Sequence, residues 1–262
     1  MNSARYTFGS TSAAAQRLEE ISRFFNPLAK AWILKYLQGP GGTVVDLGCG
    51  PGFSTDMLYG ALRGADVYGL EKSDEFLQMA RQRFPGCTFI RHDVTRGLLP
   101  IKADVSYCRF LLSHLRDIEA HVNAWTDSLT PGGMLFLDET EGINTDIPAF
   151  RRYLEINDAL VGSQGAELFV GERLSKCSFK AEVLSNELFR IPVASWRAAT
   201  WFYPNTVSVW ESEKYVLDNY AAKVRQELSE VIREIMVSKD ASVKTLWKMR
   251  RIVLKKKENN NE

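Results

Sequence analysis

Three glycines at alternate positions, Gly48, Gly50 and Gly52, carry the clearest chemical signal in the sequence. They follow the apolar run 43–47 and precede a segment with helical spacing, so they form a loop between a strand and a helix. A backbone without Cβ atoms can pass close to a bound ligand. The spacing differs from the Gly-x-Gly-x-x-Gly of dinucleotide folds. Asp46, directly before the loop, would repel a phosphate and attract a cation or an ammonium group.

Two further acids follow later apolar runs. Glu71 ends the run 66–70, where a carboxylate can accept hydrogen bonds from both hydroxyls of a ribose. Asp93 follows the run 87–90 and could accept a hydrogen bond from an exocyclic amine such as that of adenine. Because parallel strands end at one edge of a sheet, these acids and Asp46 should line one crevice. The pattern predicts a nucleoside site.

A sheet is needed to position these side chains, and the hydrophobic periodicity predicts one. Apolar runs alternate with helical segments, which predicts an α/β, doubly wound, mostly parallel sheet with helices on both faces. After residue 141 this alternation breaks, and the irregular stretches 142–170 and 200–215 are typical of helical lid insertions. The predicted strands are 43–47, 66–70, 87–90, 104–107, 134–137, 189–196 and 248–254, seven in all. The predicted helices are 18–37, 53–62, 74–84, 118–129, 174–188 and 208–237.

Composition limits the class of protein. The 262 residues are 45% apolar and carry a net charge of +1, which provides for a core but not for a nucleic-acid surface. No apolar stretch approaches the roughly 18 residues that cross a bilayer, and the N-terminus does not look like a signal peptide. The four cysteines form no Cys-x-x-Cys pair. We therefore expect a cytoplasmic protein with a small-molecule substrate and no nucleic-acid or membrane partner; oligomeric state is not indicated.

Residues 45–52 resemble the glycine motif of class I S-adenosylmethionine-dependent methyltransferases of the small-molecule type. Glu71 resembles the ribose-binding acid of that family, and Asp93-Val94 resembles its adenine-edge pair. Residues 108–115 are similar to its segment after the fourth strand, and 129–133 to its turn into the fifth. The resemblance implies a Rossmann-like methyltransferase fold and S-adenosyl-L-methionine as cofactor.

The resemblance also implies how the chain is divided. We expect an N-terminal helical cap (1–42), a cofactor-binding core (43–141) and a lid insertion (142–170). The C-terminal part of the core sheet (171–262) would hold a second helical insertion near 200–238.

The implied cofactor-binding residues come from the cap and from four strand ends. Tyr6 could close over the sulfonium by aromatic contact, or be an ordinary buried tyrosine, and Arg17-Leu18 resembles the same cap. Arg109 could bind the methionine carboxylate or merely end a strand. The implied set is Tyr6, Asp46, Gly48, Cys49, Gly50, Gly52, Glu71, Lys72, Asp93, Val94 and Arg109.

Methyl transfer from a sulfonium depends on positioning and on exclusion of water. His114 is the candidate general base, with a rate that falls below a pKa near that of ordinary histidine; it could instead only start a helix. We expect no metal, and interpret Asp138, Glu139 and Glu141 as acids that flank the substrate mouth. A dense set of aromatic residues favours an apolar pocket: Trp196, Trp201, Phe202, Tyr203 and Trp210.

The sequence thus predicts an enzyme that methylates a small apolar or aromatic metabolite on oxygen or nitrogen. Two alternatives stay open: an S-adenosylmethionine-binding scaffold that has lost catalysis, and an oxidoreductase with a nucleotide cofactor. The glycine spacing and Asp46 disfavour the oxidoreductase. A nucleic-acid methyltransferase is disfavoured by the near-neutral charge.

Overall fold

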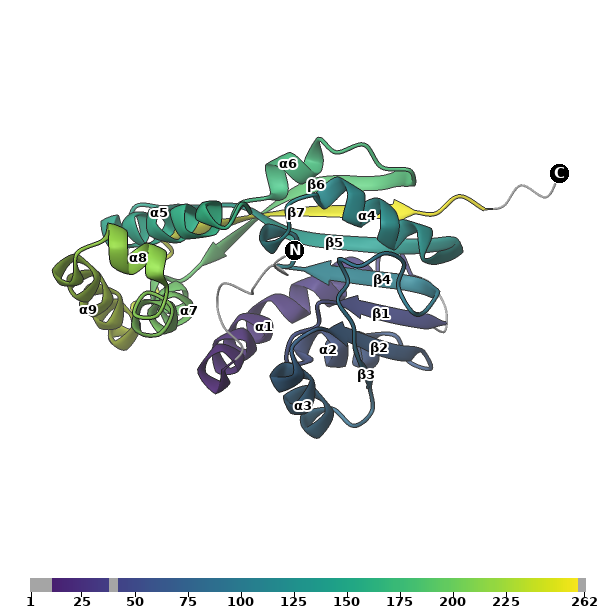
Figure 1. Ribbon diagram of the computed structural model, residues 1–262, viewed down its shortest axis with the longest axis horizontal. Coiled ribbons are helices and arrows are strands. Elements are labelled where there is room, and N and C mark those ends of the chain that lie inside the picture. The colour runs from purple at the N-terminus through teal and green to yellow at the C-terminus, as the bar shows by residue number, and fades with distance from the viewer. Residues whose placement is uncertain (1–10, 38–41, 259–262) are drawn as a thin grey trace.

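A single mixed sheet with helices on both faces organises the chain (Figure 1); the computed structural model describes residues 11–37 and 42–258. The strand order is β3-β2-β1-β4-β5-β7-β6. Neighbours from β3 to β5 pair in parallel, and β7 pairs antiparallel with both β5 and β6. The strands are β1 (Thr43–Leu47), β2 (Asp66–Glu71), β3 (Thr88–Arg91), β4 (Ala103–Arg109), β5 (Leu129–Thr145), β6 (Glu182–Val193) and β7 (Thr245–Lys255). The predicted seven-stranded, mostly parallel α/β sheet is confirmed.

The helices begin with α1, whose first turn is capped by the Thr11 hydroxyl accepting the N–H of Ala14. As predicted, α1 continues past Pro27. The helices are α1 (Ser12–Ile33), α2 (Phe53–Ala61), α3 (Asp74–Arg83), α4 (Ile118–Asp127), α5 (Pro148–Ser163), α6 (Gly171–Ser175), α7 (Ser195–Val207), α8 (Lys214–Asn219) and α9 (Ala222–Ser238), with a 3₁₀ turn, η1 (Leu112–His114).

The central strands are buried on both faces, which explains why they are apolar without alternation. In β1, Val44 packs toward α1 and α2, while Val45 packs into the cluster that contains α4. In β4, Tyr107 packs on the same face as Val44, and Cys108 packs on the same face as Val45. The sheet therefore has two cores, one on each face.

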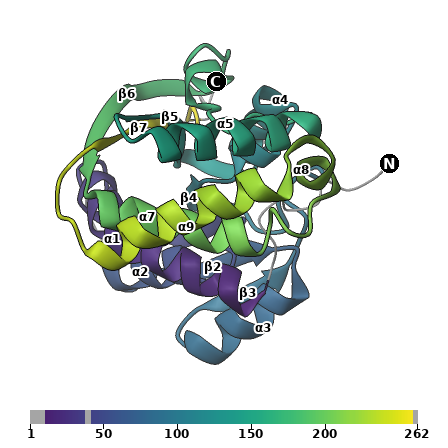
Figure 2. The ribbon, with the colours of Figure 1, turned by 90° about the vertical axis from the view of Figure 1, so that its left-hand side faces the viewer.

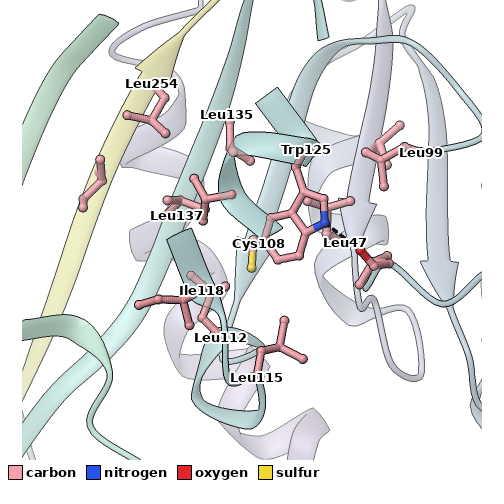
Figure 3. Close-up of a cluster of buried hydrophobic side chains, with 14 of the residues drawn as sticks. Leu47, Leu99, Cys108, Leu112, Leu115, Ile118, Trp125, Leu135, Leu137 and Leu254 are labelled. Atoms are coloured by element: carbon pink, nitrogen blue, oxygen red, sulfur yellow. Dashed lines mark hydrogen bonds between the residues drawn. The ribbon is translucent and has the colours of Figure 1, made fainter. Parts of the chain in front are cut away.

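Trp125 of α4 is the largest side chain of one of these cores (Figure 3). It is fully buried in a cluster that includes leucines of β1, β5 and β7. Its indole Nε1 donates a hydrogen bond of 2.8 Å to the carbonyl oxygen of Val94. Because Val94 belongs to the segment after β3, this bond fixes that segment against the sheet.

A third core lies beyond the end of β4, where β5 and β7 continue (Figure 1). The prediction gave the fifth strand only residues 134–137, but β5 runs from 129 to 145 and includes the expected turn at Pro131. The continued strands pair through Thr145 with Thr245. Helices α5, α7, α8 and α9 gather at this end, and Figure 2 shows α7 and α9 crossing it.

Several predicted elements are wrong in whole or in part. The strand predicted at 189–196 ends at Val193, and the helix predicted at 208–237 is divided into α8 and α9. The segment 174–188 is not a helix, because only Gly171–Ser175 is helical and β6 starts at Glu182. As the outermost strand of the sheet, β6 keeps polar residues on both faces, which hides the strand alternation. The stretch 200–215 is not irregular throughout, since α7 extends to Val207. Within the described part of the chain, no helix combines the length and apolar character that spanning a membrane requires.

We expect Trp125→Phe to lower the free energy of unfolding by about 2 kcal/mol, because it leaves the buried Val94 carbonyl without its donor and removes packed volume. Urea denaturation measures this. Trp196→Phe is the control, since Trp196 is only half-buried on α7. Equal losses in the two variants would contradict the assigned role of the Trp125 hydrogen bond.

Candidate active site

A cavity of about 670 Å³ lies at the carboxyl ends of β1, β2 and β4, beneath α1. It brings together most of the residues predicted to bind the cofactor. Its lining includes Gly48, Cys49, Gly50, Glu71, Lys72, Asp93, Val94, Arg109 and His114. Asp46 and Gly52 are not among the lining residues, and Tyr6 lies outside the described residues. We call this space the nucleoside cavity.

The glycine loop closes tightly around one wall of the nucleoside cavity. Gly48 has a φ of +64°, and a Cβ there would lie 2.8 Å from Leu111 Cδ1. Gly50 has a φ of +54° and donates its N–H to Glu71 Oε2 over 3.0 Å. Both positions therefore require glycine.

The Glu71 carboxylate accepts hydrogen bonds from three backbone N–H groups. Its Oε1 accepts the N–H groups of Lys72 and Ser73, each over 2.8 Å, and Oε2 accepts that of Gly50. These bonds orient the carboxylate at the end of β2, where it lines the cavity. The side chain keeps acceptor capacity for a ligand hydroxyl.

Asp93 is held as a carboxylate by its own turn. Oδ1 accepts the N–H and the hydroxyl of Thr95, over 3.1 and 2.7 Å, and Oδ2 accepts Arg96 Nε. Partial burial raises the pKa, but the hydrogen bonds from Thr95 and the charges of Lys72 and Arg96 outweigh it and lower the pKa of Asp93. An ionised acceptor thus faces the cavity beside Val94.

Asp46 does not line the nucleoside cavity, although its place in the glycine motif suggests that it would. Its side chain is buried, and Oδ2 accepts the hydroxyls of Ser54 and Thr55, both over 2.7 Å. Burial raises the pKa of Asp46 to about 6, against the effect of those hydrogen bonds. Asp46 therefore fixes the first turn of α2 behind the glycine loop.

Arg109 joins the end of β4 to α1. Its Nη2 donates to Asn26 Oδ1 over 2.7 Å and to Ser22 Oγ over 3.4 Å. Its Nη1 is buried and has no hydrogen-bond partner among the described residues. A cavity-lining guanidinium with a spare buried donor is suited to a ligand carboxylate.

A second, smaller cavity of about 110 Å³ adjoins the first. Four residues line both cavities, so the two cavities share one boundary: Leu18, Ile21, Phe110 and His114. The remaining walls come from α1, α5, α7 and the continued strands, and are Arg17, Ser113, Thr140, Ile143, Tyr153, Leu154, Asn157, Leu168, Phe169, Trp201, Phe202, Asn205 and Trp247. We call this space the acceptor cavity.

The predicted aromatic pocket is confirmed only for some of its residues. Trp201 and Phe202 line the acceptor cavity. Trp210 is fully buried behind it, with its ring 5.5 Å from that of Tyr153. Trp196 and Tyr203 do not belong to the lining.

His114 ends η1 at the boundary between the cavities. Burial lowers the pKa of His114 to about 3, and the positive charges of Arg17 and Lys72 act in the same direction. The imidazole is therefore neutral at physiological pH. The expected loss of rate below an ordinary histidine pKa has no basis in this environment.

The acids of β5 do not flank a substrate mouth, and that expectation is wrong. Asp138 pairs with Arg251 over 2.9 Å, and Glu141 pairs with Arg250 over 2.6 Å. Glu139 is fully buried, and none of the three acids lines either cavity. Within residues 11–37 and 42–258, no three histidines, cysteines or acids converge as a metal site.

Glu139 instead holds the turn that follows β4. Its Oε1 accepts the N–H groups of Leu111 and Leu112 over 2.9 and 3.0 Å. The preceding residue, Phe110, has a φ of +55°, a strained value for a side chain of its size. Burial raises the pKa of Glu139 to about 7, although the two N–H groups oppose this.

Sequence reasoning did not identify Phe110, Tyr153 and Trp247 as parts of the site, and it placed Glu139 at a substrate mouth instead of under the turn after β4. One signal was present: an acid inside an apolar strand must find a buried partner. The other three residues give no local signal, because each is brought to the cavity by long-range packing.

Comparison with known proteins agrees with this geometry. Residues 44–133 match the family model described as a methyltransferase domain. The trans-aconitate 2-methyltransferase of Rhodopseudomonas palustris is 31% identical over 101 residues, 38% of this chain and 40% of that relative. The enzyme of the same name from Yersinia pestis is 32% identical over 113 residues, 43% of each chain. The chain thus spans about two fifths of the length of these relatives.

Solved structures resemble the chain over most of its length. The phosphoethanolamine N-methyltransferase 2 of Haemonchus contortus, in complex with S-adenosylhomocysteine, has a TM-score of 0.57 at 14% identity, and covers 98% of this chain and 61% of its own. Coclaurine N-methyltransferase has a TM-score of 0.54 at 12% identity, over 88% and 72%. The fold is the Rossmann-like methyltransferase fold, and residues 44–133 are similar to a methyltransferase domain.

The raised pKa of Glu139 predicts how the free energy of unfolding depends on pH. Between its ordinary value of 4.5 and about 7, the folded protein holds a proton that the unfolded chain releases. The stability that this proton contributes is lost as the pH rises, by at most about 1.4 kcal/mol per pH unit. We therefore expect Glu139→Gln to gain stability relative to the parent protein from pH 5 to pH 7 in urea denaturation.

Glu234→Gln, at an exposed position of α9, controls for the loss of one negative charge. A stability difference between Glu139→Gln and the parent that stays constant from pH 5 to 7 would contradict the prediction.

Proposed function

We propose that the protein transfers a methyl group from S-adenosylmethionine to a small molecule held in the acceptor cavity. The observation that carries this proposal is the shared boundary: a cavity suited to a nucleoside opens onto an aromatic cavity at Phe110 and His114. Methyl transfer by in-line displacement needs such a junction of two sites from which water is excluded.

The residues of the nucleoside cavity fit S-adenosylmethionine. The Glu71 carboxylate suits the ribose hydroxyls, and Asp93 with Val94 suits the adenine edge. The buried Nη1 of Arg109, which lacks a partner among the described residues, suits the carboxylate of the amino-acid part. When bound, the cofactor supplies an electrophilic methyl group on a sulfonium. Residues 1–42 and 142–170 are proposed as the cap and the lid.

The protein's own residues position the acceptor. Phe110 and Ile21 line the boundary between the acceptor cavity and the nucleoside cavity, and Glu139 keeps Phe110 in place through the following two N–H groups. The neutral imidazole of His114 is a weak base, so its role is to accept a hydrogen bond and orient the acceptor rather than to store a proton.

The acceptor is proposed to be a small apolar or aromatic metabolite that is methylated on oxygen or nitrogen. Trp201, Phe202 and Trp247 give its cavity flat apolar walls. The relatives named trans-aconitate 2-methyltransferase match only about two fifths of this chain, so their names leave the acceptor open.

The cofactor assignment is tested by calorimetry with S-adenosylhomocysteine. We expect micromolar binding to the parent protein, and Glu71→Ala to weaken it by about 10- to 100-fold, because the ribose hydroxyls lose a charged acceptor. Asp66→Ala, at the exposed opposite end of β2, should bind as the parent does. Absence of heat with the parent protein, or unchanged affinity in Glu71→Ala, would refute the assignment.

The role of His114 is tested by turnover. With a panel of carboxylic acids, phenols and amines as acceptors, release of S-adenosylhomocysteine identifies a substrate and separates an enzyme from an inactive scaffold. We expect His114→Ala to lower kcat by about 100-fold through lost orientation, with an unchanged Kd for S-adenosylhomocysteine.

The ratio of parent to variant kcat/KM should stay constant from pH 5 to 8, since the imidazole does not titrate there. His121→Ala on α4 is the control, because His121 stacks on Trp125 away from both cavities. A ratio that rises through an ordinary histidine pKa would show that His114 acts as a titrating base.

A further inference from the structure

The two cavities differ in the sign of the charges that line them. The nucleoside cavity contains three acids, Glu71, Glu75 and Asp93, against the cations Lys72 and Arg109. Among the described residues that line the acceptor cavity there is no aspartate and no glutamate, and the one permanently charged side chain is Arg17. A cationic ligand is therefore matched by the first cavity and an anionic one by the second.

Hydrogen-bonding groups of the acceptor cavity point to the same conclusion. Tyr153 and Asn205 line it beside the aromatic walls. Tyr153 accepts a hydrogen bond from Asn205 Nδ2 over 2.7 Å, which leaves its hydroxyl proton to donate. A buried donor without a partner is costly, so a ligand that accepts a hydrogen bond is favoured there.

Arg17 is placed to act on this cavity from α1. It is half-buried, and its positive charge is felt by two groups of the lining, since it lowers the pKa of His114 and opposes the burial-driven rise in the pKa of Tyr153. A guanidinium presents paired N–H donors that match a carboxylate. Aromatic walls on the remaining sides suit an apolar body attached to that group.

We propose that the acceptor is a small apolar or aromatic monocarboxylic acid, and that Arg17 determines this specificity by binding its carboxylate, with the Tyr153 hydroxyl as a further donor. This inference rests on the proposed function and names the substrate class of its second site. Arg17 thereby belongs to the acceptor, rather than to the cofactor cap that its neighbourhood in sequence resembles.

The test measures binding by calorimetry to protein saturated with S-adenosylhomocysteine. The probes are phenylacetate, cinnamate and indole-3-acetate, each beside its neutral amide, and phenethylamine as a cation. We expect the acids to bind at least tenfold more tightly than their amides, and the amine to bind least. Amides or the amine binding as tightly as the acids, or no acid binding at all, would overturn the proposal.

Variants connect the preference to Arg17. Arg17→Gln should weaken the acids at least tenfold and the amides less than twofold, and Arg17→Lys should retain part of the preference. Arg23→Gln, on the exposed part of the same helix, is the matched control. Tyr153→Phe keeps the aromatic ring but removes one donor, and should weaken the acids more than the amides. An acid preference that persists in Arg17→Gln would overturn the assignment.

The affinity for S-adenosylhomocysteine distinguishes two kinds of failure. Every variant should bind it within threefold of the parent, because Arg17 and Tyr153 do not line the nucleoside cavity. If the parent fails to bind it, the proposed function fails; if it binds but acids have no advantage over amides, only the inference on the acceptor fails.

Discussion

The two hydrogen bonds from Leu111 and Leu112 to the buried carboxyl group of Glu139 are the constraint on which the site depends. They hold the turn after β4 with Phe110 in the left-handed region, a conformation that costs on the order of 1 to 3 kcal/mol. That turn carries Phe110 and His114 to the boundary of both cavities. The strain and the buried acid are each unfavourable alone, and together they fix one geometry.

The sequence was informative where structure is local. The glycine loop, Glu71 and Asp93 lie within one run of alternating strands and helices, so periodicity placed them at one sheet edge, and the nucleoside cavity brings them together. It was misleading for Asp46, since no spacing reveals that Ser54 and Thr55 bind that carboxylate. Only the folded chain shows such bonds.

The acceptor cavity could not be predicted in the same way, because its walls come from segments far apart in the chain. Arg17 of α1, Tyr153 of α5, Trp201 of α7 and Trp247 of β7 meet only through the third core. Their arrangement depends on the continuation of β5 beyond the residues that a strand pattern identifies. The methyltransferase family model ends at residue 133, before most of these walls, so the match does not extend to them.

The place of β7 has a consequence for the order of events during synthesis. In the sheet β7 lies between β5 and β6, but in the chain it follows both. While a ribosome is still translating the residues before Thr245, β6 therefore has no strand to pair with, and the unsatisfied edge of β5 stays open to solvent. Arg251 and Trp247 belong to the same strand. Until β7 has been synthesised, Asp138 therefore lacks its ion-pair partner and the acceptor cavity lacks one of its walls. A nascent chain can complete the parallel half of the sheet early, whereas the antiparallel half forms only after β7 has emerged.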